Sequence, residues 1–166
     1  MSVGLLHLPA PFSFIVSLLA AMVAGIIWSL PVALLKLGRG VHEVISTIMF
    51  NWIAHFFAFY LIANVLVDPK RGDRTLSIVE SARLTRILPT ATLNTGLLIS
   101  LVTVAIILFL LWRTSTGFEI RAAGYNPHAS HHAGISIRKQ VLRVFLIGGA
   151  TAGLAGAIQI LSLIHI

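Results

Sequence analysis

Apolar residues fall into four long runs along the chain, separated by polar and mostly basic stretches. The runs cover residues 12–35, 44–67, 95–112 and 144–166. Each is close to, or longer than, the roughly 20 residues that an α-helix needs to cross about 30 Å of hydrocarbon. The pattern predicts an all-α integral membrane fold with a single transmembrane domain over residues 1–166. Pro31 is expected to kink or fray the end of the first helix.

Composition supports a membrane protein and excludes several other classes. The chain is 57% hydrophobic and only 10% charged, which is too little charge to cover a water-soluble domain of this size. The net charge of +7 does not indicate nucleic-acid binding, because the Lys and Arg residues lie between the apolar runs, as topology bias predicts. There is no cysteine, nucleophile motif or working pair of carboxylates, so we do not expect an enzyme. The five acidic residues lie mostly in loops and are expected to be solvated.

The connections between the runs indicate how the chain lies across the membrane. With four spans, residues 36–43 and 113–143 share one side and residues 68–94 lie on the other. The first pair carries more Lys and Arg, so the positive-inside rule places it in the cytoplasm. Within the opposite connection, residues 75–88 have helical apolar spacing and predict an external amphipathic helix. Met1 then starts outside with no upstream charge, so we expect the chain to be the interior of a longer protein.

The third connection contains the signals of a very short helix. Asn126 is a favourable N-cap, and Pro127 suits the first helical position because the N–H it lacks would be unpaired there. Gly134 can end the helix in a left-handed conformation. A capped turn between two spans is interpreted as a docking site for something outside the membrane.

The second run carries a stripe of polar residues. Glu43, Thr47 and Asn51 follow one another in steps of four, which keeps them on one helical face, and His55 extends the stripe at a wider angle. Polar groups are costly against lipid, so this face should meet other helices or water. One interpretation is a pathway for a polar, uncharged solute. The other is interhelical hydrogen bonding that only holds the bundle together.

Small residues in the last run predict close helix packing. Gly149 and Gly153 form a GxxxG pair, and Ala152 and Gly156 repeat the same spacing. No Gly-Lys-Ser/Thr follows, so this glycine-rich stretch is not a phosphate loop.

Three histidines follow Pro127 in the third connection: His128, His131 and His132. No acidic residue nearby completes a metal-ligand set, and no HExxH motif is present. We therefore predict no metal site and interpret these histidines as a polar surface of the short helix.

Two segments resemble a known family of membrane proteins. Residues 40–54, GVHEVISTIMFNWIA, resemble a signature of the ABC importer permeases of the branched-chain amino acid/ribose type, and most closely their nucleoside and simple-sugar branch. Residues 121–135, RAAGYNPHASHHAGI, resemble the cytoplasmic coupling segment of that family. His42 departs from the more usual Asn. His131 and His132 stand where Ala and an aromatic or basic residue are commoner.

The resemblance implies a permease subunit in a bacterial plasma (inner) membrane. Such permeases pair with a second permease subunit, receive solute from an extracytoplasmic binding protein, and dock a separate ATP-binding cassette subunit. ATP would be bound by that partner, so no cofactor is expected in this chain. The residues implied to frame the docking element are Gly124, Asn126, Pro127, Ala129 and Gly134.

The resemblance also makes Thr47 and Asn51 candidates for lining the solute pathway, with Glu43 at its cytoplasmic mouth. An alternative is a segment of a secondary transporter or channel with no ATPase partner. Such proteins often carry charged residues inside the membrane for ion coupling, and these apolar runs carry almost none.

Overall fold

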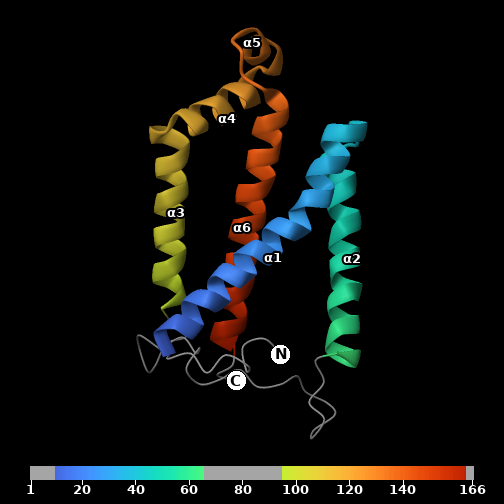
Figure 1. Cartoon of the computed structure of the whole chain (residues 1–166), viewed down its shortest axis with the longest axis vertical. Helices are drawn as coiled ribbons and strands as arrows, with labels where there is room; N and C mark the ends of the chain where they lie inside the picture. The colour runs from blue at the N-terminus through green and yellow to red at the C-terminus, as the bar shows by residue number, and fades with distance from the viewer. Residues whose placement is uncertain (1–9, 66–94, 164–166) are drawn as a thin grey trace, which may run out of the picture.

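The computed structural model describes residues 10–65 and 95–163, and within these ranges every regular element is a helix (Figure 1). The helices are α1 (Ala10–Arg39), α2 (Glu43–Asn64), α3 (Gly96–Arg113), α4 (Ser115–Tyr125), α5 (Pro127–His132) and α6 (Ile137–Leu163). Four of them, α1, α2, α3 and α6, are long and apolar enough to cross a membrane. The all-α membrane fold is therefore confirmed. The predicted external helix over residues 75–88 lies outside the described residues.

Helix α1 does not end or fray at Pro31. It continues to Arg39, and Val32 and Ala33, directly after the proline, are among its most buried residues. The helix ends where Gly40 adopts a left-handed conformation with φ of 62°, and the Gly40 N–H donates to the carbonyl of Lys36 at 3.1 Å. The end is set by this glycine rather than by the proline, because a left-handed residue is what turns the chain out of the helix.

Helices α1 and α6 cross obliquely with their backbones in direct contact (Figure 1). A Cβ atom added to Gly25 would clash with the carbonyl of Gly149, and one added to Gly153 would clash with the carbonyl of Ala21. At Gly149, an added Cβ would meet the side chain of Ser29. Only glycine fits at these positions, and the close approach maximises van der Waals contact in a lipid environment.

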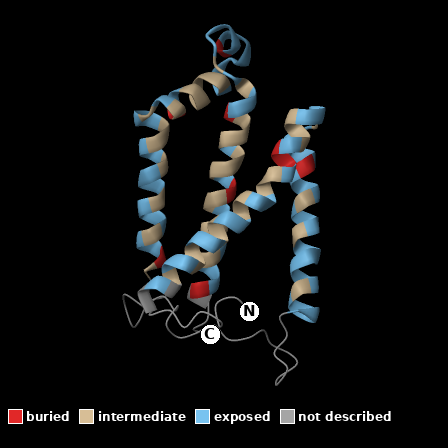
Figure 2. Ribbon diagram, viewed as in Figure 1, coloured by how far each residue is buried: buried red, intermediate tan, exposed pale blue. Residues whose placement is uncertain are grey.

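Helix α2 lies beside one end of α1 and packs through aromatic side chains. Trp28 of α1 stacks on Phe57 with ring centroids 6.0 Å apart, and it meets the edge of Phe50 at 6.2 Å. The rest of α2 is mostly exposed (Figure 2). An apolar surface of this extent is suited to lipid or to further helices rather than to water.

Candidate functional site

Helix α5 is a short helix with both ends capped, as predicted. The Asn126 side-chain Oδ1 accepts a hydrogen bond from the Ala129 N–H at 3.0 Å, while the Asn126 backbone stays extended. Pro127 occupies the first helical position. The N-terminal cap therefore follows directly from the Asn-Pro pair.

The C-terminal end of α5 forms a Schellman motif. Gly134 has a φ of 81°, and its N–H donates to the carbonyl of His131 at 3.0 Å. The Ile135 N–H donates to the carbonyl of Ser130 at 2.9 Å. Ser130 is only 5% exposed, although its neighbours in α5 are exposed. This residue therefore lies on the side of α5 that packs against the rest of the protein. The predicted role of Gly134 as the helix end is confirmed.

The predicted coupling residues gather at one end of the molecule. Helix α5 protrudes there, at the same end as the connection between α1 and α2 (Figure 1). All of the predicted coupling residues are exposed: Gly124, Asn126, Pro127, Ala129 and Gly134. Tyr125, beside them, is 89% exposed. The arrangement is an exposed projection with both ends capped, and the docking role of these residues stays a prediction.

Helix α4 was not predicted, although its start carries a local signal. The Thr114 side chain accepts a hydrogen bond from the Gly117 N–H at 3.1 Å, which is a normal N-cap. Gly117 is buried, and a Cβ atom there would clash with the carbonyls of Leu110 and Leu111 in α3. The chain therefore turns from α3 into α4 through a corner that accommodates only glycine.

Glu119 is paired, which corrects the expectation that the acidic residues are solvated. Its Oε2 accepts hydrogen bonds from Arg143 Nη1 at 2.7 Å and from Gln140 Nε2 at 2.8 Å. Arg143 Nη1 also donates to Gln140 Oε1 at 3.2 Å. Both partners lie in α6, which begins at Ile137 rather than at the predicted residue 144. Sequence reasoning missed this cluster because Glu119 lies more than twenty residues from both of its partners in the chain.

Arg121 is a half-buried cation of α4. Its guanidinium carbon lies 4.3 Å from the ring centroid of Trp112, at the end of α3. Its buried Nε has no hydrogen-bond partner among the described residues. The cation–π contact is therefore what holds this side chain, and it adds a second tie between α3 and α4.

The polar stripe on α2 is present as a face of that helix, and it is open. Glu43, Thr47 and Asn51 are all exposed in the described part of the chain. Glu43 forms an ion pair with Lys36 across the connection from α1, and the Thr47 hydroxyl donates to the carbonyl of Val44 at 3.0 Å. The described residues do not surround this face, so its role as a pathway stays a prediction.

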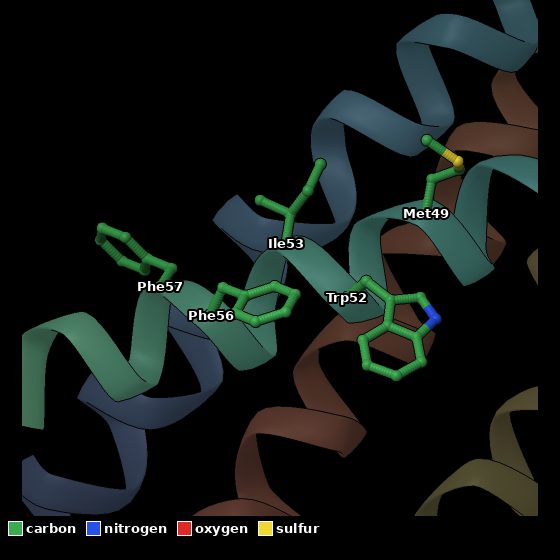
Figure 3. A pocket seen from close by; sticks show the side chains of 5 residues that line it. All are labelled: Met49, Trp52, Ile53, Phe56 and Phe57. Atoms are coloured by element: carbon green, nitrogen blue, oxygen red, sulfur yellow. The ribbon is translucent and has the colours of Figure 1, made fainter.

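An apolar hollow lies on another part of α2 (Figure 3). The side chains that line it are Met49, Trp52, Ile53, Phe56 and Phe57. They offer almost no hydrogen-bonding groups, and neither Thr47 nor Asn51 contributes to the lining. The hollow is therefore an apolar surface separate from the predicted polar stripe.

The remaining predicted residues are the packing glycines of α6 and the histidines of α5. Gly149 and Gly153 lie at the contact with α1, whereas Gly156 has open space where a Cβ would lie. His131 and His132 lie edge to face with ring centroids 6.2 Å apart. The described residues contain no group of three or more His, Cys, Asp or Glu side chains that could hold a metal ion.

Comparison with known families identifies the chain. The family model described as the permease component of the branched-chain amino acid transport system matches residues 1–166. The chain belongs to this family. Membership, together with the four apolar helices, makes it a multi-pass protein of the cell membrane and places it among transport components rather than enzymes.

Several permeases are similar to this chain in sequence. The chain is 41% identical over 159 residues to the guanosine ABC transporter permease protein of Bacillus subtilis, covering 93% of this chain and 43% of the relative. It is 35% identical to the nucleoside ABC transporter permease protein of Lactococcus lactis, and the match covers 82% of this chain and 40% of that relative. It is 31% identical to the glucose ABC transporter permease protein of Haloferax volcanii, and the match covers 92% of this chain and 43% of that relative. The chain thus spans less than half the length of these relatives. No solved structure matches it.

Proposed function

We propose that this chain forms part of the permease subunit of an ATP-driven importer for a nucleoside or simple sugar. The observation that carries the proposal is the protruding helix α5, whose two capped ends hold a rigid, exposed turn at the end of the helical bundle. The names of the relatives, which include guanosine, nucleoside and glucose permeases, support the solute class.

In this proposal, α5 faces the cytoplasm and docks a separate ATPase subunit. That partner binds and hydrolyses ATP, and its closure moves α5, which biases the helices between two arrangements that open to opposite sides. A second permease subunit and an extracytoplasmic solute-binding protein complete the importer. This chain supplies one wall of the path and the docking element, and it carries out no chemistry of its own.

The polar face of α2 is the proposed contribution to the pathway. Thr47 and Asn51 present a hydroxyl and an amide, which can exchange hydrogen bonds with a neutral polar solute without binding it as an ion. Glu43 would lie at the cytoplasmic mouth, where its ion pair with Lys36 balances its charge. The other walls of the path would come from further helices of the complete permease and of its partner.

The test uses the complete permease co-expressed with its ATPase and solute-binding protein and reconstituted in vesicles. We expect the ATPase to co-purify and its hydrolysis rate to rise with added nucleoside or sugar. A reporter fused within residues 124–134 should lie in the cytoplasm. Solute uptake that persists while no ATPase co-purifies would instead favour a secondary transporter or channel.

A further inference from the structure

Three side chains tie α4 to the beginning of α6. Glu119 projects from α4, and Gln140 and Arg143 project from the first two turns of α6. The two hydrogen bonds to Glu119 are 2.7 and 2.8 Å long, and the bond from Arg143 to Gln140 is 3.2 Å. The three residues, called the α4–α6 clamp below, therefore form a closed triangle in which each member contacts both others.

The clamp combines a partly exposed ion pair with a buried amide side chain. The side chains of Arg143 and Glu119 are 40% and 38% exposed, and Gln140 is only 3% exposed. Charge-assisted bonds of this length gain strength when water is partly excluded. Arg143 Nη1 donates to both Glu119 and Gln140, so these two acceptors favour the same orientation of its side chain.

The position of the clamp gives it a mechanical consequence. Helix α5 joins α4 through Asn126 alone, and it joins α6 through residues 133–136. On its other side, α4 is held against α3 by the tight corner at Gly117 and by the stacking of Arg121 on Trp112. If α4 could swing away from α6, a force on α5 would bend the connections instead of moving the spans.

We propose that Glu119, Gln140 and Arg143 are positioning residues that make α4 and the start of α6 one rigid body. A displacement of α5 is then delivered to α6, and through the glycine contact to α1. This inference rests on the proposed function, because it concerns how the motion of an ATPase partner reaches the membrane spans. It assigns these residues no contact with solute or with nucleotide.

The first experiment compares Glu119→Ala with Lys139→Ala in the complete, reconstituted importer. Lys139 is an exposed residue of the same region of α6, so its replacement removes a charge without touching the clamp. The solute taken up per ATP hydrolysed should fall roughly tenfold in Glu119→Ala, within the range of ordinary coupling free energies. It should stay at the wild-type value in Lys139→Ala. The ATPase subunit should co-purify equally with both.

The second experiment restores the tie by a different bond. This chain has no cysteine, so in an importer whose cysteines elsewhere are replaced, a Glu119→Cys, Arg143→Cys double variant can be joined specifically by a bis-methanethiosulfonate reagent of about the length of the two lost side chains. The double variant should lose coupling as Glu119→Ala does, and cross-linking should restore it. A merely structural loss would not be reversed in the already folded protein.

The outcomes separate the two proposals. If the wild-type permease binds no ATPase, the proposed function fails. If the ATPase binds but Glu119→Ala keeps the wild-type ratio of solute to ATP, or if the cross-link blocks uptake, the clamp proposal is overturned. Should Glu119→Ala fail to accumulate, Glu119→Gln, which keeps the shape and removes the charge, decides in its place by the same ratio.

Discussion

Two regions of the described residues differ in how completely their contacts are formed within this chain. In the first, α1 packs across α6 through backbone contact at glycines, and α4, α5 and α6 are joined by two helix caps and a polar triangle. Helix α2 instead touches α1 at one end, and it leaves both its polar stripe and its apolar hollow open. The first region is specified by residues present in this chain. The second leaves most of its surface open to lipid or to further helices.

The largest effect should come from the contact between α1 and α6. Gly153→Ala forces the backbones apart, because the new Cβ would clash with the carbonyl of Ala21. We expect a loss of about 3 kcal/mol in stability, the upper part of the range for overpacked sites. Thermal unfolding of the complete permease in detergent measures it.

Gly156→Ala is the matched control, because nothing lies within 4 Å of the added Cβ. It should be neutral or slightly stabilising, since alanine is the better helix former. Equal melting temperatures for the two variants would contradict the close contact between α1 and α6.

A smaller effect is expected at the end of α5. Gly134→Ala places a Cβ on a residue with a φ of 81°, which costs about 1–2 kcal/mol. Limited proteolysis within residues 126–136 should become faster in this variant. Gly134→Asn, which tolerates the left-handed conformation better, should lie between the wild type and Gly134→Ala. If all three were cleaved at one rate, the left-handed helix end would be ruled out.

The start of α5 should be slightly less sensitive. Asn126→Ala removes the acceptor for the Ala129 N–H, at a cost of about 1 kcal/mol. Amide hydrogen exchange over residues 128–132 should rise about fivefold, since this free energy applies to local opening. Asn126→Asp restores an acceptor and should restore slow exchange. Fast exchange in Asn126→Asp as well would show that the cap does not control this helix.

The smallest stability change is expected on the open face of α2. Thr47→Val keeps the side-chain shape on an exposed position, so unfolding should shift by less than about 0.5 kcal/mol. Solute uptake should nevertheless lose about fivefold in apparent affinity, the equivalent of one hydrogen bond. Ile48→Val, one residue further along the helix, should leave both unchanged. Unaltered uptake in Thr47→Val would support the interpretation of this stripe as packing only.

Local signals explain what could be predicted from the sequence. The four spans follow from apolar runs, and α5 follows from Asn126, Pro127 and Gly134, whose conformational preferences act within a few residues. The same reasoning placed the start of α6 too late. Arg138 and Lys139 belong to its first turn, yet their charges made this part of the helix resemble a loop.

Long-range contacts explain what could not be predicted. Glu119 resembled a solvated loop residue because its partners Gln140 and Arg143 come from a helix 21 and 24 residues further along. Likewise, the GxxxG pair predicted close packing but could not identify Gly25 as the residue that it meets. Neither partner is encoded in local spacing, since each depends on how the helices are arranged in space.

The bare contact between α1 and α6 has a consequence for motion. Where interlocked side chains separate two helices, a change of crossing angle requires several rotamers to exchange together. Here Gly25, Gly149 and Gly153 leave no side chain of their own between the two backbones. No rotamer change at these three glycines can take up a displacement of α6, so we expect the movement to pass directly from its backbone to that of α1.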